Sequence, residues 1–517
     1  MAVPAGWRTV VHAEKCPVQP AASMMDRMRM QANHRFIARR GSVLLRFALW
    51  GGGGILLLLA ILLGVYLFFG WRARLALEKT VATLISAGEP LTIDLLQPPR
   101  IDDSQNADAD VRAAIALLPG QTEASTNFRE LREGPRLPLT DEERVLLRAY
   151  LDELSPALQT LHGGLEKPRA VSQNRLTSPL LNARLPQLQP MRELANGCGY
   201  RTYLHFDDGR HDLAIESLRP IEPMSRVCGT GPTLVNCLVA MGMRAVAATR
   251  LIEIAPELKI GTATGDVTPD NLRRQIEELL DQKSQMEEFR AALQGERLMQ
   301  LDTMLNLAGG TLSVQQVTGV TGGGAPAAPS STTAFLARPM LYSNAADCLE
   351  MTGDYIKATA AADLPAARAM IDSVERRADA LSGRYTKIFA SILMPSLGRS
   401  FVTHYRVRTD QNLAATALAI RWYQVDHHGA LPDTLADLVP RYLPEVPLDY
   451  ISGRPIRYRS EGEQPIIWSV GDNEIDDEGS SESASRHPAT GPYSRWHMKD
   501  AVVFLKPQPR ATTPPGE

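Results

Sequence analysis

The longest apolar stretch in the chain is residues 47–70, FALWGGGGILLLLAILLGVYLFFG, which contains no charged side chain. An α-helix rises about 1.5 Å per residue, so a helix over this stretch measures roughly 36 Å and can cross a hydrocarbon core of about 30 Å. A cleaved signal peptide has a shorter apolar core, of about 7–15 residues, closer to the N-terminus. We therefore predict an uncleaved transmembrane helix over residues 47–70.

Positive charge is divided unequally between the two sides of this predicted helix. The twenty residues before it hold six arginines, whereas the twenty after it hold two arginines and one lysine. Because basic residues are retained on the cytoplasmic side of a membrane, this bias predicts a cytoplasmic basic arm over residues 1–46 and an extracytoplasmic location for the rest of the chain. Met24 and Met25 directly precede the basic segment, so translation that starts there is a further hypothesis.

Apolar side chains recur at helical spacing after the predicted membrane helix, and the first pattern continues as far as Gly88. Thr140 and Glu143 form a capping box ahead of an apolar face made by Leu147, Tyr150, Leu151 and Leu154. Residues 198–257 predict antiparallel helices, and residues 271–307 predict one longer amphipathic helix. We therefore predict an extracytoplasmic helical region over residues 71–309.

The segment after this region has a different composition. Residues 310–339 are rich in Gly, Ala, Ser, Thr and Pro and lack apolar periodicity, which predicts a linker or loop. Two further helical patterns, at residues 355–364 and 365–382, predict a helical hairpin within residues 340–398. The polar, proline-containing residues 508–517 predict a disordered tail.

Residues 399–507 combine a helical pattern with short β patterns. A helix with Leu413, Ala417, Ile420 and Tyr423 on one face runs into the turn Asp-His-His-Gly at residues 426–429. Three strands follow, at residues 456–459, 466–471 and 500–504, the first two as a hairpin. This order predicts a compact C-terminal α+β domain, and the fold class of the whole chain is then α+β, mostly α.

The C-terminal domain resembles the globular domain of the major pseudopilin of type II secretion systems. The matching positions are Leu431-Pro432, Pro447 and Asp449 before Ser452-Gly453, Tyr458, and Ser469-Val470-Gly471 before acidic residues. The resemblance implies a helix packed on a small antiparallel sheet, in a protein of the bacterial inner membrane. Nothing around Gly41-Ser42 fits the processing site that precedes the membrane helix of these pseudopilins. We therefore expect a recognition module and not a pilus subunit.

An acidic loop follows Gly471, at the place where the resembling pseudopilins bind calcium. A calcium ion takes six to eight oxygen ligands, and the loop offers oxygens from Asp472, Asn473, Asp476 and Asp477. The resemblance thus implies a calcium site at these four residues, and a solvated acidic loop without an ion is the alternative. Calcium is the one cofactor that we predict.

Overall charge argues against nucleic acid as a partner. The formal net charge is −3 and the pI is near 6.4, with no basic cluster outside the arm before the predicted membrane helix. That arm and helix predict the lipid bilayer as a partner. Four cysteines lie on the predicted outer side, where three disulfide pairings are possible and buried free thiols are the alternative: Cys198, Cys228, Cys237 and Cys348.

No catalytic or cofactor-binding residues can be assigned from motifs, because G-x-S-x-G, H-E-x-x-H, Walker A and G-x-G-x-x-G patterns do not occur in a workable context. His205, Asp207, Asp208 and His211 gather around a predicted turn between helices, and turn formation explains them better than a metal site. His427-His428 also fall in a predicted turn, as surface residues.

These features predict an envelope protein that binds or scaffolds a partner, such as a protein of a type II secretion or pilus-like system. The alternative is an extracytoplasmic hydrolase with an unrecognised site in the helical region. A deep pocket with convergent polar groups favours the hydrolase, whereas an exposed apolar groove favours the scaffold.

Overall fold

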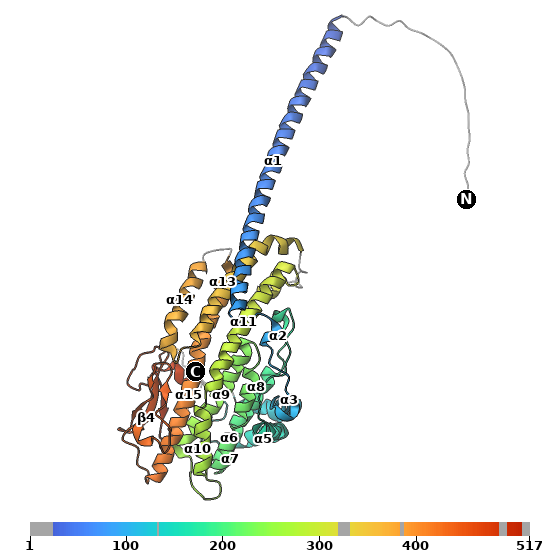
Figure 1. The fold of residues 1–517 in the computed structure, drawn as a ribbon. Helices are drawn as coiled ribbons and strands as arrows, with labels where there is room; N and C mark the ends of the chain where they lie inside the picture. Colours follow the sequence, from blue (N-terminus) through green and yellow to red (C-terminus); the bar gives the residue numbers. More distant parts are fainter. Residues whose placement is uncertain (1–23, 132–133, 319–330, 383–386, 485–493, 509–517) are drawn as a thin grey trace, which may run out of the picture. The chain divides into compact units, whose positions relative to one another are not determined.

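The computed structural model describes residues 24–131, 134–318, 331–382, 387–484 and 494–508. The chain divides into two compact units, residues 1–69 (unit 1) and 70–517 (unit 2), which are described separately. The protein is mostly helical, at 65%, with small antiparallel sheets (Figure 1). The mixed, mainly α fold class predicted from the sequence is therefore confirmed at this level.

Unit 1 consists, in its described part, of helix α1 (Met24–Ser86), which continues into unit 2. The leucine and isoleucine side chains from Ile55 to Leu63 are between 53 and 68% exposed. A helix that exposes so many large apolar side chains is unfavourable in water and suits a lipid environment. The stretch Trp50–Ser86 is long and apolar enough to cross a membrane. Residues 1–23 of the predicted basic arm lie outside the described residues.

The predicted helical region of unit 2 forms a stack of antiparallel helices. The capping box at Thr140 is present, because its Oγ1 accepts the N–H of Glu143 at 3.2 Å and the Glu143 carboxylate accepts the N–H of Thr140 at 2.8 Å. The apolar face of the helix that it opens is buried, as predicted. The helices are α2 (Ile93–Leu96), α3 (Asp108–Ala116), α4 (Glu123–Arg129), α5 (Asp141–Thr160), α6 (Leu188–Asp207), α7 (His211–Glu216), α8 (Ile221–Gly229), α9 (Leu234–Ile254), α10 (Pro269–Leu280) and α11 (Lys283–Gly309), with 3-10 turns η1 (Asp103–Gln105), η2 (Leu161–Glu166), η3 (Leu180–Asn182) and η4 (Ala255–Glu257).

The single helix predicted over residues 271–307 is wrong, because α10 and α11 are separated at Asp281 and Gln282. The buried side-chain amide of Gln282 causes the break. Its Nε2 donates to the carbonyl of Leu279 at 3.1 Å, to the carbonyl of Arg408 at 3.1 Å, and to Oδ1 of Asn412 at 2.9 Å. The helix is therefore interrupted at the residue whose side chain forms hydrogen bonds to the helix that contains Arg408 and Asn412.

Part of the predicted linker is also helical. Helix α12 spans Val314–Thr318 and helix α13 spans Ser331–Ala358, so the linker prediction is wrong for these residues, while residues 319–330 lie outside the described part of the chain. Tertiary contacts explain the early start of α13: Nε of Arg338 donates to the carbonyl of Ala308 at 3.0 Å, and Met340 packs on a hydrophobic cluster with Leu301. Helix α14 (Leu364–Ser382) follows as predicted.

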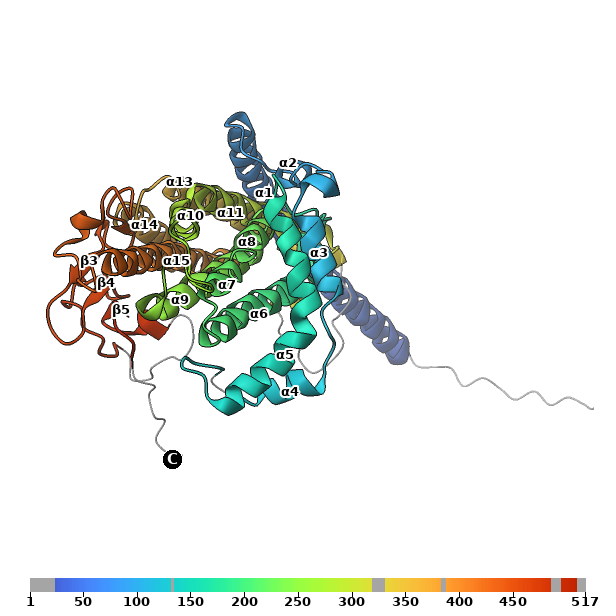
Figure 2. The same cartoon turned by 90° about the horizontal axis from the view of Figure 1, so that it is seen from below.

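The C-terminal segment has the predicted order of elements. Helix α15 (Ile388–Asp426) is followed by η6 (Leu435–Leu438), the two-stranded sheet β1 (Leu448–Asp449) with β2 (Arg454–Pro455), and the three-stranded antiparallel sheet β3 (Arg457–Arg459), β4 (Ile466–Val470) and β5 (Asp500–Phe504), with η7 (Ser494–His497) before β5. In register, Tyr458 is opposite Ile467, and Ile467 is opposite Val503. Figure 2 shows β3, β4 and β5 side by side next to α15.

Helix α15 belongs equally to the helical stack and to the sheet. The proposed boundary between residues 398 and 399 falls inside this helix. Its first half contributes Phe401 and Tyr405 to a cluster with Phe289 of α11, and its second half contributes Leu418 to a cluster that includes Ile467 and Val503 of the sheet. Residues 70–517 accordingly form one compact unit and not a chain of separate domains.

The four cysteines on the predicted outer side are free and buried. Cys228 and Cys237 lie in different hydrophobic clusters, and Sγ of Cys228 donates to the carbonyl of Asn236 at 3.2 Å. Of the two alternatives left open by the sequence, the structure contains the buried thiols.

Candidate functional site

The acidic loop after β4 uses its carboxylates in ion pairs with arginines. Asp472 pairs with Arg406, and Oδ2 of Asp476 accepts Nε of Arg457 at 2.6 Å. The other oxygen of Asp476 accepts Nε1 of Trp468 at 3.0 Å, so both oxygens of this carboxylate already have hydrogen-bond donors. Asn473 and Asp477 bond to each other, from Nδ2 to Oδ2 at 2.7 Å. The four predicted calcium ligands therefore have different partners: Asp472 pairs with an arginine, Asp476 bonds to an arginine and a tryptophan, and Asn473 and Asp477 bond to each other.

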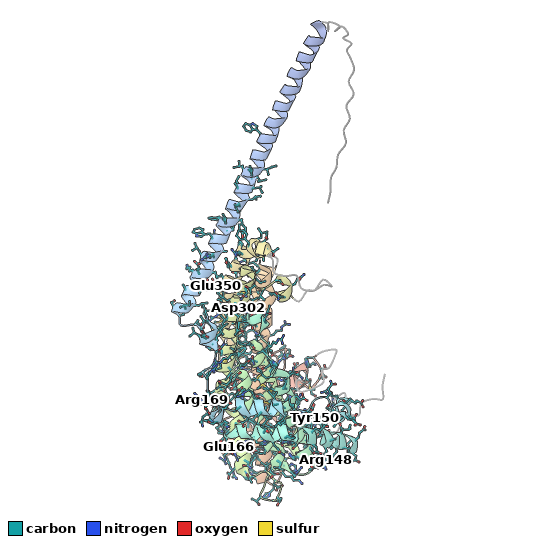
Figure 3. All side chains as sticks on the ribbon, turned by 90° about the vertical axis from the view of Figure 1, so that its right-hand side faces the viewer. Arg148, Tyr150, Glu166, Arg169, Asp302 and Glu350 are labelled. Atoms are coloured by element: carbon teal, nitrogen blue, oxygen red, sulfur yellow. The ribbon has the colours of Figure 1, made fainter. Side chains whose placement is uncertain are left out.

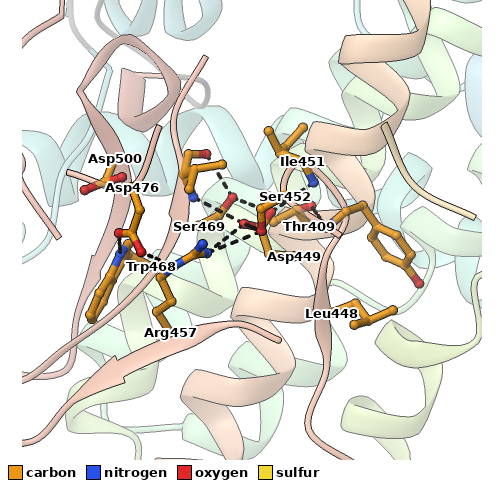
Figure 4. A network of polar contacts seen from close by, with 12 residues as sticks. Thr409, Leu448, Asp449, Ile451, Ser452, Arg457, Trp468, Ser469, Asp476 and Asp500 are labelled. Atoms are coloured by element: carbon orange, nitrogen blue, oxygen red, sulfur yellow. Dashed lines mark hydrogen bonds and ion pairs between the residues drawn. The ribbon is translucent and has the colours of Figure 1, made fainter. Parts of the chain in front are cut away.

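The centre of this region is Asp449, a fully buried carboxylate (Figure 4). Its Oδ1 accepts Oγ of Ser469 at 2.6 Å and the N–H of Ile451 at 3.0 Å. Its Oδ2 accepts Oγ of Ser452 at 2.6 Å, Nη1 of Arg457 at 3.2 Å and the N–H of Val470 at 3.3 Å. Arg457 thus stands between Asp449 and Asp476 and supplies positive charge to both carboxylates.

A second buried carboxylate, Asp500, holds the far end of the loop. It accepts the N–H of Asp477 at 3.2 Å, of Gly479 at 2.8 Å and of Ser480 at 3.0 Å. Burial raises the pKa of Asp500, and these three N–H donors oppose that rise. Gly479 has φ +76°, a left-handed conformation that glycine adopts without strain. The loop is therefore anchored by backbone hydrogen bonds at the sheet.

Arg406 and Arg457 already pair with two of these carboxylates, and no three His, Cys, Asp or Glu side chains converge on one point within the described residues, so calcium binding stays a prediction. We expect the melting temperature of the purified full-length protein to change by less than about 1 °C between millimolar calcium and excess chelator, since an ion that binds only the folded state must stabilise it. A rise that saturates with calcium and is lost on replacing Asp472 with asparagine would confirm the predicted calcium site.

The histidine and aspartate cluster forms the turn that the sequence predicts. Oδ2 of Asp207 accepts Nε of Arg144 at 2.7 Å, and Oδ1 of Asp208 accepts Nη2 of Arg148, labelled in Figure 3, at 2.5 Å. Burial lowers the pKa of His205 to about 4, so its imidazole is neutral. Both carboxylates are committed to arginines of α5, and the cluster joins α5 to α6. His428, at φ +56°, also lies in its predicted turn.

The structure contains a cleft that the sequence did not predict. It has a volume of about 510 Å³ and lies where α3, α6, α8 and α9 meet two irregular segments, residues 97–103 and 172–175. Figure 3 shows this side of unit 2, with Arg169 labelled just before the second segment. The lining residues are Arg100, Ile101, Asp103, Asp108, Val111, Arg112, Ile115, Ser172, Gln173, Asn174, Arg175, Gln187, Met191, Val227, Cys228 and Asn236.

The irregular wall of the cleft is held by hydrogen bonds that join residues 97–106 to residues 171–176. Nδ2 of Asn106 donates to the carbonyl of Val171 at 2.8 Å, and the N–H of Val171 donates back to Oδ1 of Asn106 at 2.9 Å. Further along, Nε2 of Gln97 donates to the carbonyl of Leu176 at 2.8 Å. Asn106 is fully buried, so its side chain replaces the backbone partners that a sheet would provide.

The cleft has an apolar floor and a charged rim. Val111, Met191 and Val227 are buried in the hydrophobic cluster of the helical stack, and they form the floor. On the rim, Arg112 bridges two carboxylates, with Nε 2.8 Å from Oδ2 of Asp108 and Nη2 2.7 Å from Oδ1 of Asp103. The hydrogen bond and charge of Asp108, with a smaller contribution from Asp103, raise the pKa of Arg112 in spite of partial burial.

Two rim arginines have no carboxylate partner among the described residues. Nη1 of Arg175 donates to Oε1 of Gln97 at 3.0 Å and to the carbonyl of Pro98 at 2.9 Å, which are neutral acceptors. The guanidinium of Arg100 is exposed and makes no hydrogen bond or ion pair within the described part of the chain. With two aspartates against three arginines, the lining carries a net charge of +1.

The lining contains no group suited to covalent catalysis. Burial raises the pKa of the Cys228 thiol to about 12, so it is protonated and a poor nucleophile. No histidine lines the cleft, and Oγ of Ser172 accepts the N–H of Asn174 at 3.3 Å. The arrangement can bind an anionic group at the rim and an apolar group on the floor.

The cleft was missed because its wall has no periodicity. Residues 97–107 read as an irregular connector, and their partners lie 65 to 79 residues away along the chain. The sequence does contain a proline pair here, Pro98-Pro99, which argues against a helix interior or a central strand but does not identify a cleft.

No family model, no curated protein and no solved structure matches this chain.

Proposed function

We propose that this protein is a membrane-anchored, extracytoplasmic binding protein whose cleft takes a small organic anion with an apolar part. The observation that carries the proposal is the pair of arginines, Arg100 and Arg175, above an apolar floor and without carboxylate partners. A hydrogen bond to a charged group contributes about 1.5–3 kcal/mol, so these two guanidinium groups select for an acid. The floor favours the apolar part of the same molecule by burying its surface.

The membrane anchor rests on α1. Its exposed apolar stretch and the excess of arginine before that stretch support a single crossing with the N-terminus in the cytoplasm. The cleft then faces the extracytoplasmic space. The resemblance of residues 399–507 to pseudopilins supports a secretion or pilus-like system as the setting, with the C-terminal sheet as the surface for a protein partner.

A hydrolase is the second candidate, because polar groups do converge in the cleft, as expected for an enzyme. Asp108 is its only nearly buried carboxylate, and Arg112 holds it in an ion pair. Asp108 would have to act as the general base, so an Asp108→Asn variant that binds an ester or phosphoester normally but no longer hydrolyses it identifies an enzyme.

Binding can be tested with two dyes that differ in one charge. 1-Anilinonaphthalene-8-sulfonate carries a sulfonate, and N-phenyl-1-naphthylamine is its neutral analogue. We expect Arg100→Gln to raise the Kd of the full-length protein for the anionic dye about tenfold and to leave the neutral dye within about twofold, because one charge-assisted contact is worth about 1.4 kcal/mol or more. The measurement is fluorescence titration in lipid nanodiscs, with empty nanodiscs subtracted.

Arg100 is the suitable position because its guanidinium makes no hydrogen bond to other described residues, whereas that of Arg175 bonds to Gln97 and Pro98. The matched control is Arg376→Gln, since Arg376 is an exposed arginine of α14 outside the cleft lining. Equal weakening of both dyes, or none for either, would show that the cleft does not select anions.

A further inference from the structure

One end of unit 2 exposes large apolar side chains beside the first turns of its part of α1. Phe335 and Leu336, in the second turn of α13, are 40% and 62% exposed, and Trp71 is 60% exposed. Figure 1 shows the first turns of α13 next to this part of α1. Apolar side chains gathered at one end of a protein usually mark a contact surface.

Helix α13 runs parallel to α1 at this end. Cγ of Pro339 lies 3.4 Å from the position that a Cβ on Gly70 would take. One turn further, the pKa of Arg74 is raised, mainly by Glu78 and to a smaller extent by Tyr342 of α13, which places Tyr342 nearby. Leu77 then shares a hydrophobic cluster with Leu341, Ala345 and Leu349.

Residue numbers therefore increase together along the two helices. Phe335 and Leu336 precede Pro339 by four and three residues, which corresponds to roughly 5 Å along a helix. They therefore lie within about one turn of the contact between Pro339 and Gly70.

The position of Gly70 sets the expected height of a bilayer. The apolar run 47–70 ends there, and Trp71 and Arg72 follow. Tryptophan concentrates at the headgroup level of membranes, and arginine remains in water or reaches back to the headgroups. With the membrane anchor proposed above, on which this inference rests, the boundary of the hydrocarbon core passes near Gly70. A distance of roughly 5 Å from that boundary is within the depth at which interfacial helices bury apolar side chains.

We propose that the first turns of α13 form a second membrane contact, in which Phe335 and Leu336 insert into the outer leaflet. Arg338 connects this contact to the rest of unit 2. Its Nε donates to the carbonyl of Ala308 in the last turn of α11 at 3.0 Å, and its guanidinium lies 5.4 Å from the centre of the Phe335 ring. The inserted turn is thus joined to α11, and contact with lipid limits the tilt of unit 2 against the bilayer.

The test uses the full-length protein in liposomes, with the environment-sensitive dye NBD attached to one cysteine at a time. The four cysteines of unit 2 are buried, and Cys16 is replaced by serine. Labels are placed at Leu336→Cys, at Leu62→Cys within the apolar run, and at Val145→Cys, which is an exposed apolar position of α5 and serves as the control. Quenching by lipids with a doxyl group near the headgroup or deep in the acyl chain reports the depth of each label.

We expect the shallow quencher to reduce emission from the label at position 336 about twofold or more, and to leave the label at position 145 unchanged. Quenching at position 62 by the deep lipid together with an unquenched label at 336 would overturn the second contact and leave the anchor intact. An unquenched label at 62 would overturn the anchor. In that case quenching at 336 still supports an interfacial role for α13, and absence of quenching at both positions overturns both proposals.

Discussion

Replacement of Asp449 by alanine should lower the free energy of unfolding by about 3–5 kcal/mol, because it removes the acceptor of five hydrogen bonds from a fully buried position. Ser469, Val470 and Arg457 would each lose a partner that water cannot reach easily. The measurement is chemical denaturation of the full-length protein, followed by tryptophan fluorescence, since Trp468 belongs to the same network.

Two further variants show whether the charge or the packing of Asp449 matters. Asp449→Asn keeps the size of the side chain and should cost less than the alanine variant, because it retains one acceptor oxygen. Asp433→Ala, at an exposed aspartate of the same segment, should change stability by less than about 0.5 kcal/mol. If Asp449→Ala were no more destabilising than Asp433→Ala, the network in Figure 4 would not hold the sheet to α15.

Replacement of Arg244 by methionine should also cost about 3–5 kcal/mol, because it leaves Glu288 buried without a counterion. The side chains of Arg244 and Glu288 are 3% and 6% exposed, and they join through Nη1–Oε2 at 2.8 Å and Nη2–Oε1 at 3.1 Å. Nε of Arg244 also bonds to Glu222 of α8 at 2.9 Å. Burial raises the pKa of Glu288 and Arg244 opposes this rise, so loss of Arg244 forces Glu288 towards its protonated form.

The double variant Arg244→Met with Glu288→Met measures how much of the loss comes from the interaction between these two residues. A buried ion pair replaced on both sides by apolar residues of similar volume is often neutral, so the second substitution should recover at least half of the stability lost in the first. The same denaturation midpoints provide the comparison. Additive losses in the double variant would show that the two residues stabilise the bundle independently and not as a pair.

Much of the helical stack is predictable from local patterns. The apolar face of α5 and its cap at Thr140 are present as expected, because each depends on residues within one or two turns. The helix, hairpin and final strand of residues 399–507 are also found in the predicted order, since their alternation and turns are local too.

The features that the sequence did not predict depend on side chains far apart in the chain. The break between α10 and α11 follows from Gln282, whose partner Asn412 is 130 residues away. The cleft depends on Asn106 and Val171, and the early start of α13 depends on Arg338 and Ala308. A periodic pattern contains no information about such pairs, because their energy arises only when the chain is folded.

The acidic loop is a further case in which local patterns do not identify the partners of a side chain. Its carboxylates follow β4, and Asp472 and Asp476 pair with Arg406 and Arg457. The two arginines lie before the loop, in α15 and β3, and the spacing of acids alone could not identify them as partners.

The length of α15 has a mechanical consequence. A helix of 39 residues measures roughly 58 Å, and this one begins next to Lys387, whose Nζ pairs with Asp347 of α13, and ends beside the C-terminal sheet. Because side chains on both halves of the helix are locked into hydrophobic clusters, it acts as a stiff rod and not as a hinge. A force on the sheet, such as the pull of a bound partner, is therefore transmitted over the full length of unit 2 to the neighbourhood of α13.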